Sequence, residues 1–265
     1  LVVRMRGDLE QWTRVANATA LFLVAFPLMH IARYEVQRSQ RPPVVAARPA
    51  KVTRAALPAS GACPDIYYII LDRYASASTL AESFHFDNRD LLNSLRAKGF
   101  YVAEESHSNY LKTTLSLATS LNMEYLDDLA GTMGANCDDL VPVNAKLRDH
   151  KVGRFLQARG YRYLHVGPLF EPTIENPYAD ENYNASPANL VGTPFLARCL
   201  SDPSLPPDTR SWWSELQGIR HWLSAKYQFE KLAEISKRPE RKFVFAHILV
   251  PHSPYVFDRE GRYLP

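Results

Sequence analysis

An uncharged segment near the start of the chain most constrains how this protein can be organised. The 18 residues from Val15 to Ala32 include no Asp, Glu, Lys or Arg. As an α-helix they would extend about 27 Å, which matches the hydrocarbon core of a bilayer. Pro27 and His30 are compatible with such a helix. We therefore expect a transmembrane helix over about residues 15–33, within a membrane anchor formed by residues 1–36. A buried core helix and a secretory signal peptide are the alternatives.

The arginines on either side of this segment bear on its orientation. Three precede it and four follow it, namely Arg4, Arg6 and Arg14, and then Arg33, Arg38, Arg41 and Arg48. Counted by the positive-inside rule, they place the C-terminal side in the cytoplasm. Residues 37–62 are rich in Pro and Ala without apolar periodicity, which predicts a linker. Residues 63–265 then form the main domain.

Composition excludes several classes of protein. Hydrophobic residues make up 46% of the chain, as in ordinary globular proteins, so wholesale disorder is excluded. The net charge of +3 is too balanced for a protein that coats nucleic acid. The three cysteines, Cys63, Cys137 and Cys199, are too scattered for a disulfide scaffold or a usual zinc cluster. The sequence leaves open whether Cys137 and Cys199 form one disulfide bridge.

From residue 63 onward, apolar runs typical of strands alternate with segments typical of helices. The expected strands are 65–71, 100–103, 161–166 and 242–250, and the expected helices are 88–98, 152–159 and 212–236. Gly99 and Gly160 directly follow two of these helices, where glycine commonly ends a helix. The alternation predicts an α/β domain with a mostly parallel central sheet flanked by helices. The polar segment 180–207 is expected to be a surface insertion.

The first expected strand ends in a carboxylate. Its continuous apolar run, 65–71, is typical of a strand buried on both faces, and Asp72 follows directly. In parallel sheets, ligands bind beyond the carboxyl ends of the strands. Asp72 is therefore a candidate ligand for a hard cation, and equally a candidate helix cap or partner for Arg73.

Hydroxyl side chains cluster in residues 108–122, where a helix is expected to begin with Thr113 or Thr114 as its cap. An ordinary threonine cap is one interpretation. The other is a hydroxyl nucleophile at the positive end of the helix dipole, where backbone N–H groups bind an anionic ester and a metal ion activates the hydroxyl. Asn109 and Lys112 are candidate substrate contacts, or part of a solvated loop.

A histidine between two prolines follows the last expected strand, in the sequence Pro-His-Ser-Pro-Tyr at 251–255. His252 suits contact with a substrate or a metal better than a place in the core, with a surface turn as the alternative. His247, inside the apolar strand, is expected to be a core histidine with satisfied hydrogen bonds.

Taken in order, these segments resemble the sulfatase-like N-terminal domain of the alkaline phosphatase–sulfatase superfamily. Pro64 to Asp72 is similar to the family's opening Pro-Asn-Ile/Val-apolar-Asp pattern. Residues 113–123 align without a gap with its Cys-x-Pro-Ser-Arg nucleophile helix, which puts Thr113 at the nucleophile and Ser116 at the family serine. Residues 251–255 are similar to its Pro-His-x-Pro-Phe/Tyr element. The resemblance implies an alkaline phosphatase-like fold for the α/β domain.

Two departures point away from a true sulfatase. Thr113 replaces the nucleophilic cysteine, and Leu117 replaces the arginine four positions later. A threonine at this position resembles the membrane-anchored branch that includes lipoteichoic-acid synthases and phosphoethanolamine transferases. That branch implies transfer of a phospho-alcohol group from a lipid donor, through a phospho-threonine, to an acceptor hydroxyl or to water.

The resemblance also implies a site. A divalent metal ion (Mn, Zn, Mg or Ca) would be held by Asp72 and Thr113, with Arg73 instead of a second aspartate beside it. Thr114 is the fallback nucleophile. The implied substrate contacts are His252, Asn109 and Lys112.

The implied setting is a bacterial cell membrane with the catalytic domain outside the cytoplasm, which reverses the orientation given by the arginine count. The implied partners are the membrane and a lipid or anionic ester substrate, without nucleic acid. The family's later Asp-His metal pair has no counterpart, because Asp149 and His150 precede a helix instead of following a strand. We therefore expect a C-terminally incomplete piece of a longer protein, itself inactive.

Two other interpretations stay open from the sequence. One is a sulfatase-like hydrolase of soluble phosphate or sulfate esters that uses the membrane helix only as a tether. The other is a membrane-anchored relic that keeps the fold without the chemistry.

Overall fold

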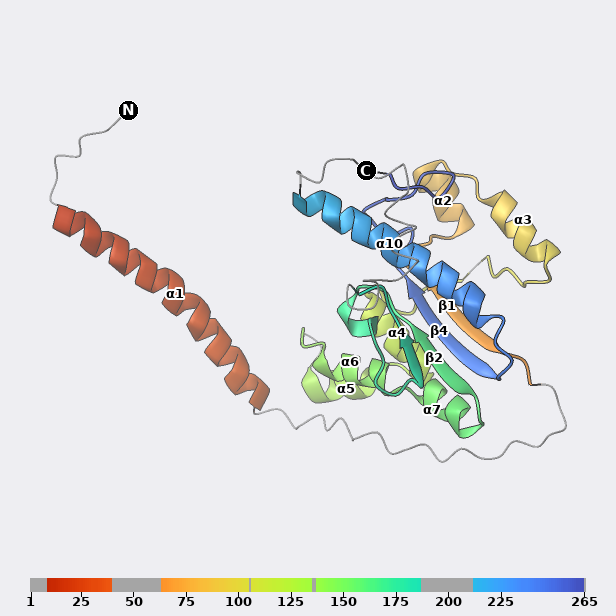
Figure 1. Ribbon diagram of the computed structural model, residues 1–265. Coiled ribbons are helices and arrows are strands. Elements are labelled where there is room, and N and C mark those ends of the chain that lie inside the picture. The colour runs from red at the N-terminus through yellow and green to blue at the C-terminus, as the bar shows by residue number, and fades with distance from the viewer. Residues whose placement is uncertain (1–8, 40–62, 105, 135–136, 187–211, 265) are drawn as a thin grey trace. The chain divides into compact units, whose positions relative to one another are not determined.

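The computed structural model describes residues 9–39, 63–104, 106–134, 137–186 and 212–264 (Figure 1). The chain divides into two compact units, Leu1–Ala47 and Arg48–Pro265. Most of the expected linker, residues 40–62, lies outside the described residues.

The N-terminal unit contains one helix, α1 (Leu9–Ser39), among its described residues. It includes the whole predicted span 15–33, and its segment Trp12–Arg33 is long and apolar enough to cross a membrane. Its described side chains are exposed, and Leu21 and Phe22 are 70% and 66% accessible. A helix with apolar side chains all around suits a hydrocarbon environment and is costly to expose to water.

The second unit is an α/β domain around a four-stranded, all-parallel sheet. The strands are β1 (Ile66–Leu71), β2 (Arg162–Val166), β3 (Glu181–Tyr183) and β4 (Lys242–Ile248). Their order across the sheet is β1-β4-β2-β3. The predicted class, a parallel sheet flanked by helices, is confirmed.

Helices cover both faces of this sheet (Figure 1). The described helices of the domain are α2 (Ala77–Phe84), α3 (Arg89–Ala97), α4 (Thr113–Asn122), α5 (Asp127–Met133), α6 (Val141–Arg148), α7 (Lys151–Ala158), the 3-10 helix η1 (Glu171–Thr173) and α10 (Trp212–Ile235). Helices α3, α7 and α10 were predicted. Gly99 and Gly160 follow the first two with φ of 86° and 80°, left-handed values that glycine adopts without steric cost.

Three local predictions were wrong. Residues 100–103 form no strand, and Tyr101 is 91% exposed, because this apolar stretch pairs with no neighbouring strand. The segment 180–207 contains β3, which pairs with β2, and residues 187–211 lie outside the described part. Strand β1 is at the edge of the described sheet instead of buried on both faces, so Ile69 stays 47% exposed.

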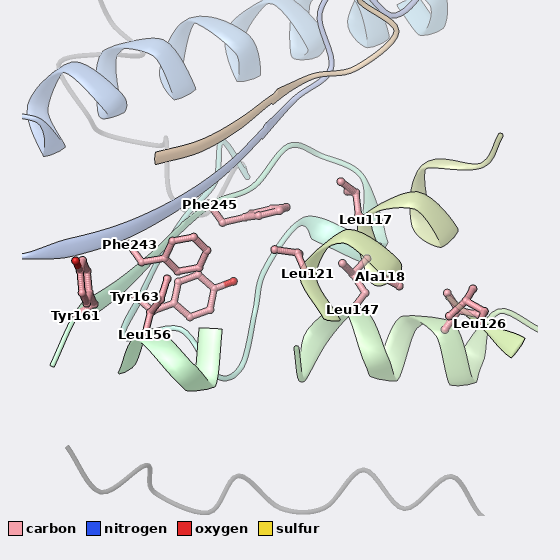
Figure 2. Close-up of a cluster of buried hydrophobic side chains, with 11 residues drawn as sticks. Leu117, Ala118, Leu121, Leu126, Leu147, Leu156, Tyr161, Tyr163, Phe243 and Phe245 are labelled. Carbon is pink, nitrogen blue, oxygen red and sulfur yellow. The ribbon is translucent and has the colours of Figure 1, made fainter. Parts of the chain in front are cut away.

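Alternate residues of β4 face the two helical layers. Phe243 and Phe245 belong to the core cluster that includes Leu117 and Leu121 of α4 (Figure 2). Val244 and Ala246 pack instead with Ile235 of α10. Each fully buried side chain of this size contributes about 1.5–3 kcal/mol. Because side chains alternate along a strand, His247 falls on the same face as Phe245, the face covered by α4.

The cysteines form no described bridge. Cys63 and Cys137 are free thiols, and Cys199, the other half of the bridge left open by the sequence, lies outside the described residues.

Candidate functional site

Strands β1 and β4 bring Asp72 to the carboxyl edge of the sheet. In their parallel register Ile70 lies opposite His247 and Leu71 opposite Ile248. The Asp72 backbone N–H continues this pairing by donating to the Ile248 carbonyl at 2.9 Å. The predicted strand-end position of this carboxylate is therefore confirmed.

The backbone turns sharply immediately after Asp72. Arg73 has φ of 64°, in the left-handed region that residues with a side chain rarely adopt. The Tyr74 N–H donates back to the Leu71 carbonyl at 3.2 Å, which closes the turn. Such backbone strain is concentrated at functional sites in proteins.

A buried histidine lies beside the Asp72 carboxylate. The separation between His247 Nε2 and Asp72 Oδ2 is 3.6 Å, longer than a hydrogen bond, with the His247 side chain fully buried and that of Asp72 16% exposed. The His247 imidazole holds the pKa of the Asp72 carboxyl below its usual value, and the charges of His252 and Arg73 act in the same direction. Burial opposes this shift. The balance keeps Asp72 ionised at neutral pH.

His247 does not behave as the satisfied core histidine expected from the sequence. Its Nδ1 shares a hydrogen bond of 2.8 Å with the Thr173 hydroxyl. Its Nε2 is buried and has no hydrogen-bond partner in the described part of the chain. A buried polar atom without a partner is costly, so this nitrogen needs an explanation. The prediction was wrong for this atom.

A buried polar network supports Thr173 and fixes the tautomers around it. The Gly153 N–H donates to His150 Nδ1 at 2.9 Å, so the neutral His150 ring donates from Nε2 to the Tyr163 hydroxyl at 3.0 Å. That hydroxyl then donates to His165 Nδ1 at 3.3 Å, and His165 Nε2 donates to the Thr173 carbonyl at 2.8 Å. Every donor in this network has one acceptor, and Thr173 is thereby held against His247.

The His252 loop lies within electrostatic reach of Asp72. Both X–Pro bonds that flank this histidine, Val250–Pro251 and Ser253–Pro254, are cis. His252 Nδ1 donates to the Ser253 carbonyl at 2.6 Å, which directs the lone pair of a neutral ring to Nε2. That nitrogen is the atom with which His252 would contact a substrate.

Helix α4 begins at Thr113, but neither threonine caps it. Lys112 occupies the cap position and makes no side-chain capping bond, so the threonine-cap interpretation was wrong. Thr113 is the first helical residue and is half-buried, whereas Thr114 is 5% exposed. Thr113 is therefore the more accessible hydroxyl at the positive end of α4.

The segment before α4 is folded back onto the helix. The Ser116 hydroxyl donates to Asn109 Oδ1 at 2.8 Å, and Asn109 Nδ2 donates to the Thr119 hydroxyl. The Asn109 side chain is thus occupied in holding this loop, while Lys112 is exposed. Of Asn109 and Lys112, Lys112 is therefore the better candidate to contact an anionic substrate.

By the alternation of side chains along β1, Asp72 falls on the sheet face that α4, the helix of Thr113, covers. Helix α4 packs through Leu117 against the sheet face that carries Phe245 and, by alternation, His247 (Figure 2). Asp72 contacts His247 from that face. Within the described residues Thr113 and Asp72 form no hydrogen bond with each other.

The described residues include no group of three or more His, Cys, Asp or Glu side chains arranged to hold a metal ion. Among the described residues, Asp72 and His247 form a pair of possible metal ligands. His247 and Thr173 were missed because they are neighbours only in the fold, although the alternation along residues 243–247 could have placed His247 on the Asp72 side.

Comparison with known proteins adds no relative: no family model, no curated protein and no solved structure matches this chain.

Proposed function

We propose that the chain is a sulfatase-like, metal-dependent enzyme with an alkaline phosphatase-like fold, which transfers or hydrolyses a phospho-alcohol group. The observation that carries the proposal is the ionised Asp72 carboxylate at the carboxyl edge of the sheet, 3.6 Å from a buried His247 nitrogen that has no hydrogen-bond partner among the described residues. Cation ligands and catalytic groups gather at this edge in parallel α/β domains.

The Asp72–His247 pair fits a divalent cation. Two ligands of one cation, each about 2.1 Å from it at tetrahedral angles, lie about 3.4 Å apart. A metal-ligating histidine usually donates its other ring nitrogen to a fixed acceptor, and the Thr173 hydroxyl can be that acceptor for Nδ1. Asp72 and His247 would therefore hold the cation, together with the Thr113 hydroxyl. When bound, such a cation supplies Lewis-acid chemistry.

Thr113 is the proposed nucleophile. Its Oγ attacks phosphorus in line and the bond from phosphorus to the donor alcohol breaks. The proton lost by the Thr113 hydroxyl passes to the departing alcohol oxygen, so charge and atoms balance. An acceptor hydroxyl or water then attacks the phospho-threonine and restores the Thr113 hydroxyl. Transfer and hydrolysis of the phosphate ester differ only in this second acceptor.

Other groups stabilise the anion in this proposal. The free N–H groups of the first turn of α4 and the Lys112 side chain lie at one end of the bound ester. His252 Nε2 contacts its oxygens from the β4 side.

The membrane setting is part of the same proposal. Helix α1 anchors the chain in a bacterial cell membrane, and the α/β domain works outside the cytoplasm on a lipid donor. The length and apolar composition of Trp12–Arg33 support the anchor.

Metal affinity of the whole chain in detergent micelles tests the proposal. Asp72→Asn and His247→Gln should each weaken Mn²⁺ or Zn²⁺ binding at least about tenfold by titration calorimetry, since each removes one ligand atom. Asp72→Asn is the cleaner variant, because its side chain keeps the same shape.

His107→Gln is the matched control, because it removes an exposed histidine outside the pair. Its affinity should equal that of the unmodified chain. Equal affinity in the Asp72→Asn variant would exclude this metal site, and it would favour the relic interpretation.

A further inference from the structure

A cavity of about 250 Å³ lies beside the candidate site, between α10 and the loop after β4. Helix α10 contributes Gln217, Arg220, His221 and Ser224, and the loop contributes Leu249 and Pro254. The cavity therefore opens at the carboxyl edge of the sheet, on the side of the His252 loop opposite to α4.

The polar groups of this cavity are arranged for an anion. Arg220 is exposed and forms no ion pair with any described residue, and none of the described residues that line the cavity is acidic. An unpaired guanidinium in a concave site without carboxylates favours a phosphate or carboxylate group.

Ser224 gives an independent indication of a ligand. Its side chain is 5% exposed, and its hydroxyl oxygen is buried without a hydrogen-bond partner in the described part of the chain. A buried hydroxyl in this state lowers the stability of the free protein relative to one with a hydrogen-bond partner. A ligand oxygen in the cavity would remove that cost.

The cavity is connected electrostatically to the candidate site through His252. Burial lowers the pKa of His221 below its usual value, and the charge of His252 acts in the same direction, while a hydrogen bond to the Leu249 backbone opposes this shift. The charge of His252 also lowers the pKa of the Asp72 carboxyl. His252 therefore lies within electrostatic reach of both His221 and Asp72.

We propose that this cavity binds the anionic group of a phosphorylated alcohol, with Arg220 and the Ser224 hydroxyl as its partners. This inference rests on the proposed function. In that function the cavity positions a substrate by binding one of its anionic groups, which is not the phosphoryl group that reacts. Binding itself does not require the metal pair, because Arg220 and Ser224 belong to α10.

Phosphate binding without metal tests the cavity separately from the proposed function. The whole chain in detergent micelles is titrated with inorganic phosphate and then with glycerol 2-phosphate, in the presence of EDTA. Both should bind, and Arg220→Gln should weaken binding about tenfold, the effect of losing one charge-assisted hydrogen bond. Because EDTA removes any bound metal, failure of the metal site would leave this phosphate binding intact, and failure of the cavity would leave metal binding intact, so the two failures are distinguished.

Ser224→Ala separates ligand binding from folding. Without phosphate, its melting temperature should equal or exceed that of the unmodified chain, because the substitution removes an unsatisfied buried hydroxyl. Its phosphate affinity should nevertheless fall several-fold. Lys237→Gln is the charge control, because Lys237 is an exposed cation just after α10 and outside the cavity.

A short-chain phosphatidic acid distinguishes the two sources of the anion. Tighter binding of this lipid than of glycerol 2-phosphate would assign the cavity to a lipid headgroup, and the reverse order would assign it to a soluble acceptor. The proposal is overturned if no phosphate compound binds, or if Lys237→Gln weakens binding as much as Arg220→Gln.

Discussion

Replacing Thr113 with alanine in the full-length protein should abolish the covalent phospho-enzyme formed with a phospholipid donor. The threonine Oγ is the atom to which phosphorus would be bonded, so no adduct can form at this position without it. Intact mass spectrometry after incubation with donor and metal measures the adduct directly. This is the largest effect we expect from a single substitution.

Two neighbouring substitutions make that result specific. Thr113→Ser keeps a hydroxyl at the first residue of α4 and should retain the adduct as phospho-serine. Thr114→Val replaces the buried neighbouring hydroxyl with a side chain of the same shape and should retain it as well. An adduct that persists in Thr113→Ala and disappears in Thr114→Val would transfer the nucleophile role to Thr114.

Acidification should destabilise the α/β domain well above the pH at which carboxylates titrate. Burial lowers the pKa of both His150 and His165 to about 4, and repulsion from other histidines adds to each shift. In the unfolded chain both titrate near 6.5, so below that pH the unfolded state binds protons that the folded state does not. The free energy of unfolding should therefore be highest above pH 6.5. It should fall towards pH 4 by up to about 1.4 kcal/mol per pH unit for each histidine.

Urea unfolding monitored by tryptophan fluorescence at a series of pH values measures this slope, since Trp222 is fully buried. A variant with His165→Gln should show a shallower dependence between pH 6.5 and 4, and His107→Gln should match the unmodified chain. A free energy of unfolding that stays constant between pH 7 and 5 would show that folding does not lower the pKa values of these histidines.

Much of the fold follows from local sequence signals. Strand β1 is a continuous apolar run and β2 and β4 are rich in apolar and aromatic residues, while α3 and α7 are each followed by a glycine with a left-handed backbone. The strand-end position of Asp72 follows from the same pattern, because the apolar run stops one residue before it.

Other features depend on contacts that no local pattern records. Strand β3 has three residues and is polar, so only its pairing with β2 identifies it as a strand. Residues 100–103 have a strand-like sequence pattern, but they pair with no described strand and form none themselves. The partnerships of His247 with Thr173 and Asp72 join residues 74 and 175 positions apart in the sequence, and they form only when β4 lies between β1 and β2 in the sheet.

The position of a bound cation tests most directly whether Asp72 and Thr113 share one reaction centre. Crystals of the full-length protein grown with Mn²⁺ would locate the ion by its anomalous scattering. We expect a single peak about 2.0–2.4 Å from both the Asp72 carboxylate and the Thr113 hydroxyl, with His247 Nε2 turned towards it. A peak bound elsewhere in the domain, or one at Asp72 with the Thr113 hydroxyl out of reach, would contradict the threonine mechanism.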